Sequence, residues 1–159
     1  MDAKTKQETL RLLTNGMYVI TSRGQHRLAA ATVTWVSQVS FKPPLVMAAV
    51  RRNSSILHSL SESGVVALHM VGRHQKDVAQ KFFSTTKGEG GVLKGEPFAE
   101  GKTSAPILTN LPAHLECRVV DIREEYGDHA IVILEVVEAE LRKPCQVLTV
   151  RESPWRYGG

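Results

Sequence analysis

The chain has 159 residues, of which 42% are apolar and 23% charged, with a net charge of +4. This length predicts one domain, and the composition is that of an ordinary globular protein. Because the charges are scattered and not gathered in blocks, the chain lacks the arm of a nucleic-acid-binding protein. The polar start MDAKTKQETL predicts no signal peptide, and no apolar run is long enough to span a membrane. The two cysteines lack C-x-x-C spacing, which fits a cytoplasmic protein. From the charge pattern and the missing apolar run, we expect no nucleic-acid partner and no membrane partner.

The first part of the chain is expected to form one helix followed by three strands. Asn15-Gly16 is a stop signal for the helix. Pro43-Pro44 breaks the second strand, since proline cannot donate to a sheet ladder. The third strand is apolar on both faces, which predicts a central place in the sheet. The predicted elements are a helix over 5–14 and strands over 17–22, 28–39 and 45–50.

The second part is expected to add two short helices and four strands. Residues 84–113 are rich in glycine and proline and predict a long loop, which in a compact domain is functional or covers a neighbouring subunit. Gly127-Asp128 predicts a tight turn. Strands joined mostly by tight turns predict a mainly β fold, an antiparallel barrel with short inserted helices. The predicted helices span 54–63 and 74–83, and the strands 65–71, 114–126, 129–141 and 147–150.

The segment TVTWVSQVSFKPPLVMAAVRRNSS, from Thr32 to Ser55, joins a hydroxyl-rich strand to a basic turn that opens onto a helix. Ser54 or Ser55 can cap the helix that begins near Ile56. The free N–H groups of that helix start and the nearby guanidinium groups can then face a phosphate. From the residues alone, a capped helix with exposed arginines explains the turn equally well.

Several patterns that indicate other chemistries are absent. Five residues separate Gly95 from Gly101, where the P-loop has four, and Ser-Ala-Pro follows Lys102-Thr103 in place of a helix. The chain has no G-x-G-x-x-G after a strand and no G-x-S-x-G. The six histidines show none of the metal-binding spacings, so no metal site is expected.

Two features near the end of the sequence also stand out. His129 follows the turn Gly127-Asp128, and turn chemistry alone explains that pattern. The tail SPWRYGG carries two aromatic residues. Because chain ends are usually frayed and polar, aromatic residues there indicate that the tail docks on another part of the protein.

Together these segments resemble the flavin reductase-like family. Its FMN-binding split barrel carries a T-x-[ST] strand, an S-x-x-P-P corner and a basic-x-[NS]-S turn, as at 32–34, 40–44 and 51–54 here. The G-D-H at 127–129 is also similar to a family signature. TWVSQVSF and the W-x-Y-G-G tail resemble a subgroup that includes flavoredoxin-like proteins and the flavin reductase modules of flavodiiron proteins. The resemblance runs from Asn15 to the end of the sequence.

The resemblance implies one FMN-binding split β-barrel domain over 1–159, assembled as a homodimer with the flavin at the interface. It implies that His129 is the catalytic residue, close to the cofactor and the nicotinamide pocket. Trp35 stands where many members carry serine, and a backbone contact could still hold the cofactor there. The implied cofactor-binding residues are Thr32, Val33, Thr34, Trp35, Ser37, Gln38, Arg51, Asn53, Ser54, Ser55, Trp155 and Tyr157.

The function implied by the resemblance is that of an NAD(P)H:flavin oxidoreductase. It would pass a hydride from NAD(P)H to FMN or FAD, and electrons on to an acceptor, which could be a redox-protein or flavin-dependent partner. Two alternatives stay open. The chain could be a bound-FMN electron carrier that a protein partner reduces, or a non-enzymatic split barrel that binds flavin or heme.

Overall fold

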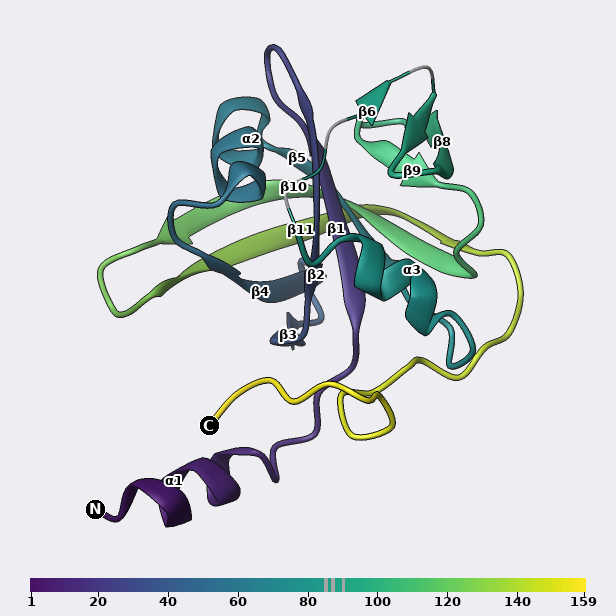
Figure 1. Ribbon diagram of the computed structural model, residues 1–159. Coiled ribbons are helices and arrows are strands. Elements are labelled where there is room, and N and C mark those ends of the chain that lie inside the picture. The colour runs from purple at the N-terminus through teal and green to yellow at the C-terminus, as the bar shows by residue number, and fades with distance from the viewer. Residues whose placement is uncertain (85, 87, 90) are drawn as a thin grey trace.

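A seven-stranded antiparallel sheet, curled into a half-barrel, forms the body of the molecule (Figure 1). The computed structural model describes residues 1–84, 86, 88–89 and 91–159. The strand order is β2-β1-β5-β10-β11-β4-β3, and the curl brings β2 into contact with β4. The prediction of a mainly β, antiparallel fold is therefore confirmed. The strands are β1 Tyr18–Arg23, β2 Leu28–Val33, β3 Val36–Ser40, β4 Leu45–Arg51, β5 Val65–Met70, β10 Ala113–Arg123 and β11 His129–Leu141.

The region predicted as a long loop, 84–113, contains a second, four-stranded sheet, so that prediction was wrong for the residues of these four strands. Thr85, Lys87 and Gly90 of this region lie outside the described residues. The strands are short because glycine and proline interrupt them, and no hydrophobic alternation could develop over so few residues. They are β6 Gly88–Glu89, β7 Val92–Leu93, β8 Glu96–Glu100 and β9 Pro106–Leu108.

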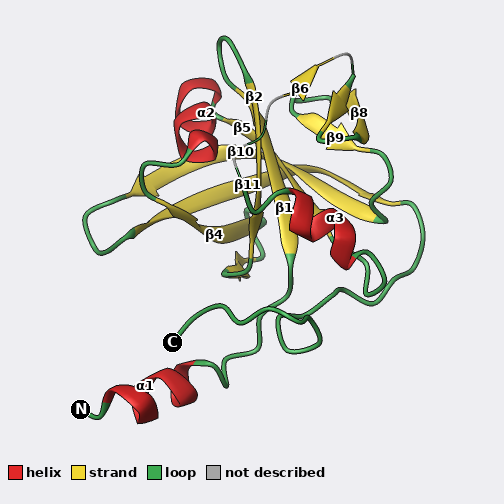
Figure 2. Cartoon of the chain, viewed as in Figure 1, coloured by secondary structure: helices red, strands yellow, loops and turns green. Residues whose placement is uncertain are grey.

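The helices are α1 Ala3–Leu10, α2 Ser55–Ser63 and α3 Lys76–Lys81 (Figure 2). The prediction for α2 is confirmed, with Ser54 as its N-cap and Gly64 in the left-handed conformation as its C-cap. The predicted first helix was four residues too long at its C-terminal end, and α1 buries none of its residues. The third helix is shorter than 74–83, because its last turn ends before the buried Phe82.

Three strand predictions also need correction. The stretch 28–39 is not one strand, because the chain breaks at Thr34-Trp35 and continues as β3. β4 lies beside the edge strand β3 and not at the centre of the sheet, and its residues alternate between buried and half-buried. Residues 147–150 form no named strand and make only isolated bridges to Gly16 and Gly72.

Two apolar clusters hold the fold together. The first fills the curl of the half-barrel, where Leu68 and Leu134 of the sheet pack with Leu60 of α2. The second lies against the other face of β1 and β2, where Phe82 after α3 packs with Leu93 of the small sheet. The two helices therefore cover different faces of the curled sheet. Among the described residues, no helix is both long and apolar enough to cross a membrane.

Candidate functional site

A cavity of about 580 Å³ opens between the ends of β2 and β4, the start of α2, the segment after α3 and the C-terminal tail. It brings together all the predicted site residues except Ser37 and Gln38. The predicted residues that line it are Thr32, Val33, Thr34, Trp35, Arg51, Asn53, Ser54, Ser55, His129, Trp155 and Tyr157.

One wall of the cavity is the turn that links β4 to α2. Asn53 adopts a left-handed conformation (φ 59°), which asparagine tolerates better than most residues and which turns the chain into the helix. The Ser54 hydroxyl donates to the Arg51 carbonyl (2.7 Å) and accepts from the Leu57 N–H (3.2 Å). The hydroxyl is thus engaged in the cap. The first N–H groups of the helix, which begins at Ser55, have no intrahelical partner, as in every helix, and suit an anion.

Arg52 has a different task from Arg51. Its N–H donates to the Asp128 carbonyl (3.0 Å), and its guanidinium group donates to the Gly127 carbonyl (3.1 Å). These two contacts fasten the β10–β11 turn to the start of α2. Arg51 lines the cavity, whereas Arg52 is not among the lining residues. Of the two adjacent cations, Arg51 is therefore the one available to an anion in the cavity.

The two threonines of the β2 end differ in how their hydroxyl groups are used. The Thr32 hydroxyl donates to the Ala79 carbonyl (2.6 Å), which ties α3 to β2. The Thr34 hydroxyl is buried and has no hydrogen-bond partner in the part of the chain that the structure describes. A buried hydroxyl without a partner costs about 1–3 kcal/mol. Its place in the cavity wall therefore fits a bound molecule that offers a polar edge.

His129 lies beside Arg51, because the two residues are cross-strand partners in the β11–β4 ladder. Its Nδ1 lies 2.7 Å from Oδ1 of Asp128, and its Nε2 lies 3.0 Å from the Tyr157 hydroxyl. The hydrogen bond with His129 lowers the pKa of the Asp128 carboxyl. Because that carboxylate can only accept, the neutral ring carries its proton on Nδ1 and leaves Nε2 as an acceptor.

Aromatic rings surround this histidine and extend along the tail. The Trp35 ring lies 4.7 Å from the His129 ring and 5.4 Å from the Tyr157 ring, between ring centroids. Trp155 packs edge-on against Phe83, with ring centroids 4.8 Å apart. The tail thus docks along the cavity, and flat aromatic surfaces suited to a planar ring system line one side of it.

Ser37 and Gln38 lie elsewhere. They line a second cavity of about 450 Å³, whose other lining residues, such as Leu68 and Met70, are mostly apolar. Their hydrogen bonds stay within β3 and its turn, from the Ser37 hydroxyl to the Gln38 carbonyl and from the Gln38 amide to the Ser40 carbonyl. A cofactor contact by these two residues therefore stays a prediction.

Sequence reasoning missed several lining residues. Phe82, Phe83 and Ser84 reach the cavity because α3 ends early, and Met17 reaches it from the segment before β1. Arg156 also lines the cavity, between the two tail aromatics that were predicted. Its position between the two aromatic residues of the W-x-Y tail was the sequence signal that could have indicated Arg156 as a lining residue. It adds a second arginine to the lining.

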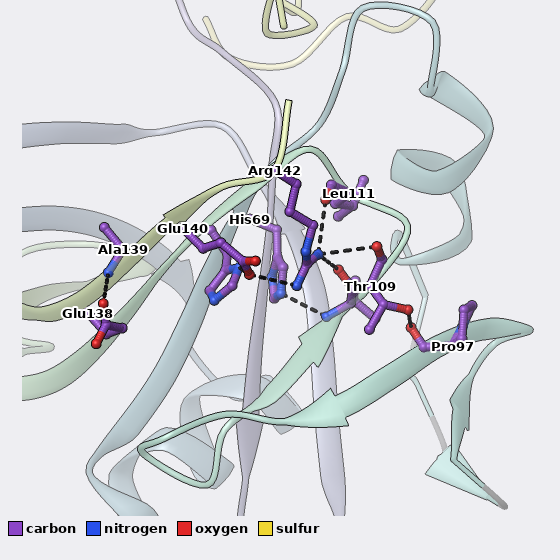
Figure 3. A network of polar contacts seen from close by, with 10 residues as sticks. His69, Pro97, Thr109, Leu111, Glu138, Ala139, Glu140 and Arg142 are labelled. Atoms are coloured by element: carbon purple, nitrogen blue, oxygen red, sulfur yellow. Dashed lines mark hydrogen bonds and ion pairs between the residues drawn. The ribbon is translucent and has the colours of Figure 1, made fainter. Parts of the chain in front are cut away.

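A separate polar network lies away from this cavity and fastens the small sheet to the half-barrel (Figure 3). The Arg142 guanidinium group donates to the carbonyls of Leu108, Thr109 and Leu111 and pairs with Glu140 at 2.9 Å. His69 accepts from the Leu108 N–H. These residues serve structure, since none of them lines either cavity. Among the described residues, no group of three His, Cys, Asp or Glu could hold a metal ion.

The Gly101-Lys102-Thr103 turn also has a structural partner. The Thr103 N–H and hydroxyl both donate to the Glu116 carboxylate at 2.8 Å, and Lys102 pairs with Glu138. A Cβ on Gly101 would meet the same carboxylate at 2.5 Å. The groups of this turn therefore bind a carboxylate of the protein itself, that of Glu116.

Comparisons with known proteins match most of the chain. The family model of the flavin reductase like domain matches residues 10–151. The NADH-dependent FMN reductase RutF 2 of Methylorubrum extorquens is 28% identical over 141 residues, covering 86% of this chain and 78% of its own. Diflavin flavoprotein A 1 of Synechocystis is 30% identical, covering 82% of this chain but only 23% of the longer protein. The solved NADH:FAD oxidoreductase SgcE6 of Streptomyces globisporus superimposes with a TM-score of 0.70 at 26% identity, covering 81% of this chain and 76% of that one.

Proposed function

The chain belongs to the flavin reductase-like family, and on that premise we propose that it is an NAD(P)H:flavin oxidoreductase that binds FMN or FAD in the 580 Å³ cavity. The observation that carries this proposal is the arrangement of the cavity walls. An anion-suited turn with Arg51 lines the cavity, and beside it Trp35, His129 and Tyr157 form a cluster of rings. A flavin nucleotide has a phosphate and a planar ring system, which need these two kinds of surface.

The phosphate end is held by the β4–α2 turn. Arg51 supplies a guanidinium group, and the first N–H groups of α2 supply donors aligned with the helix dipole. Asn53 and Ser54 shape this turn, and Ser54 contributes through the cap. Arg52 holds the neighbouring turn in place, so that His129 keeps its position relative to the phosphate end.

The ring end is held by the break between β2 and β3. The Thr34 hydroxyl is the polar group of this wall without a partner in the described chain, and it would bond to a polar edge of the ring system. Trp35 offers a flat surface in place of the serine hydroxyl that many relatives carry. The Trp35 carbonyl accepts from the Ala49 N–H at 2.9 Å, so a backbone hydrogen bond from Trp35 to the ring would come from its N–H.

The bound flavin supplies the redox chemistry, accepting a hydride from the nicotinamide and passing two electrons on to an acceptor. The protein orients the donor and excludes water. His129 orients the nicotinamide, because its ring is fixed by Asp128 and faces the cavity. The aromatic tail closes this side of the cavity against solvent.

We also infer that the 159 residues act as one domain and form a homodimer in the cytoplasm. Phe41, after the edge strand β3, is 87% exposed, and Val39 on β3 is 50% exposed. Both residues flank Ser40 in the sequence. Pro44, which follows closely, lines the second, mostly apolar cavity. A second copy would bury this apolar surface. The two cysteines are unpaired, as in a reducing compartment.

One observation favours a second function. The match to a diflavin flavoprotein covers only 23% of that protein, so the same domain also occurs as a module of a longer flavoprotein. A chain of this kind could keep its flavin bound and take electrons from a protein partner. In that case NAD(P)H would oxidise slowly, and reduction by the partner would be fast.

The test is the visible spectrum of the purified protein, loaded with FMN and mixed with NADH without oxygen. We expect FMN to bind with low-micromolar affinity or better, seen as quenched flavin fluorescence, and NADH to bleach the bound flavin. A protein that quenches no flavin fluorescence on titration contradicts the proposal. A protein that binds FMN tightly but stays oxidised with NADH supports the electron carrier. Sedimentation at micromolar concentration tests the dimer separately.

A further inference from the structure

His129 has both ring nitrogens occupied in this structure. Asp128 takes Nδ1 and Tyr157 takes Nε2, at 2.7 and 3.0 Å. The proposed function, on which this inference rests, needs His129 to contact the nicotinamide. One of the two partners must therefore give way when the hydride donor binds.

The Asp128 contact is the more firmly placed of the two. Asp128 is the chain neighbour of His129, and Arg52 fastens this turn through the carbonyls of Gly127 and Asp128. The Asp128 carboxylate is 94% exposed, so solvent weakens its charge, and it is the fastened turn that makes Asp128 harder to displace than the hydroxyl of the tail.

The Tyr157 contact is the more easily exchanged. Tyr157 lies in the tail and is 38% exposed, and the two residues after it have positive φ angles of 95° and 96°. Within the described part of the chain, one hydrogen bond holds the tail beyond Tyr157, from Arg11 Nε to the Gly158 carbonyl at 3.1 Å, and Gly159 lies against Gln7 of α1. Arg11 is exposed and Gly158 is half-buried. Tyr157 can therefore leave Nε2 by a small movement of the tail.

We propose that Tyr157 occupies the place on His129 that the carboxamide of the hydride donor takes. With the proton on Nδ1, Nε2 only accepts, so its partner must donate. The Tyr157 hydroxyl donates, and the N–H₂ of a nicotinamide carboxamide can replace it. A carboxylate at that position has no hydrogen to offer. Tyr157 thus competes with the nicotinamide, and His129 selects an amide over an acid.

The test compares Tyr157→Phe with wild type, because phenylalanine keeps a ring beside Trp35 and removes only the hydroxyl group. The donors are NADH and its reduced nicotinic acid analogue, used with FMN-loaded protein. Removing a neutral competitor should lower KM for NADH about two- to tenfold, the worth of one neutral hydrogen bond. KM for the acid analogue should change less than about twofold. Tyr126→Phe is the matched control, since Tyr126 is 75% exposed in the β10–β11 turn and should leave both values unchanged.

A second readout does not depend on flavin reduction. Nicotinamide and nicotinic acid are titrated into flavin-free protein and followed by tryptophan fluorescence, which Trp35 reports. Tyr157→Phe should tighten binding of nicotinamide and not of nicotinic acid, and His129→Ala should remove the difference between the two. An unchanged KM for NADH, or an equal gain for amide and acid in both assays, overturns the competition. A wild-type protein that fails to bind FMN overturns the proposed function instead, while this titration still decides the role of Tyr157.

Discussion

Two histidines of this protein have both ring nitrogens in hydrogen bonds, yet their surroundings differ. His69 is fully buried, and its partners are backbone groups, the Val19 carbonyl at 3.0 Å and the Leu108 N–H at 2.9 Å. The partners of His129 are side chains at the rim of a cavity. Backbone partners in a core cannot be exchanged without unfolding, whereas a tail side chain can be. The comparison separates a histidine that holds the fold from one that meets a ligand.

Of all the changes proposed here, replacing the buried histidine should have the largest effect, a loss of stability of the fold. His69→Ala leaves the Leu108 N–H and the Val19 carbonyl without partners and creates a cavity. We expect the free energy of unfolding to fall by about 3–5 kcal/mol. Urea unfolding measures this as a lower midpoint at unchanged slope. The matched control is His58→Ala, at an exposed helix position, where a change within about 0.5 kcal/mol is expected. A loss below that of the control would mean that His69 does not fasten the small sheet.

Removing the cation of Arg51, the cross-strand partner of His129, should weaken ligand binding and leave the fold intact. A charge-assisted hydrogen bond to phosphate contributes about 1.5–3 kcal/mol, so Arg51→Ala should weaken FMN binding about tenfold or more. Riboflavin, which has no phosphate, should bind almost as before. Fluorescence titration of both flavins gives the ratio. Arg52→Ala serves as the control, because its contacts go to the turn at Gly127 and Asp128. An equal loss for both flavins would place Arg51 away from the phosphate.

Replacing the rim histidine should change the reaction and leave the fold intact. His129→Ala should slow reduction of bound FMN by NADH about ten- to a hundredfold, because hydride transfer depends steeply on the orientation of the donor. FMN affinity should stay within a few-fold, and circular dichroism should be unchanged. Stopped-flow absorbance measures the rate. If the mutant reduces its flavin as fast as wild type, His129 only flanks a turn, and the contrast with His69 disappears.

The change of stability with pH should be the smallest of these effects when it is counted per pH unit. Burial lowers the pKa of His69 from its ordinary value to about 3, so the folded protein keeps this ring neutral. The unfolded chain takes up the proton near pH 6.5. This contribution is therefore complete above about pH 6.5 and is lost, by about 1.4 kcal/mol per pH unit, as the pH falls toward 3. Urea midpoints between these limits measure the slope. His69→Gln should flatten it, and an unaltered slope would assign the effect to other groups, such as His114, whose pKa burial also lowers.

The parts of the fold that could be predicted are those with strong local signals. The helix α2 follows from a serine cap, an apolar face and the stop at Gly64. The β10–β11 hairpin follows from two long apolar strands around Gly127-Asp128. The break at Thr34-Trp35 carries no such signal, since both residues favour strands, and only the pairing of β3 with β4 sets the limits of β3. The strands of the small sheet are too short for any periodicity to show.

The lining of the candidate site could be predicted in part. The family motifs indicated 11 of the 23 residues that line the cavity, because a binding turn and an aromatic tail are local features of the sequence. The partner of His129 could not be foreseen in the same way. That the Tyr157 hydroxyl meets Nε2 depends on how the tail crosses the cavity, which the tertiary packing of Trp155 on Phe83 decides.

The unequal burial of the two thiols has a practical consequence. Cys117 is fully buried in the half-barrel, and burial raises its pKa to about 12, so it stays a protonated, unreactive thiol at neutral pH. Cys145 is exposed on the segment between β11 and the tail. A maleimide dye should therefore couple to Cys145 alone, without any mutation. The native chain thus carries its own single attachment point for fluorescence or surface immobilisation.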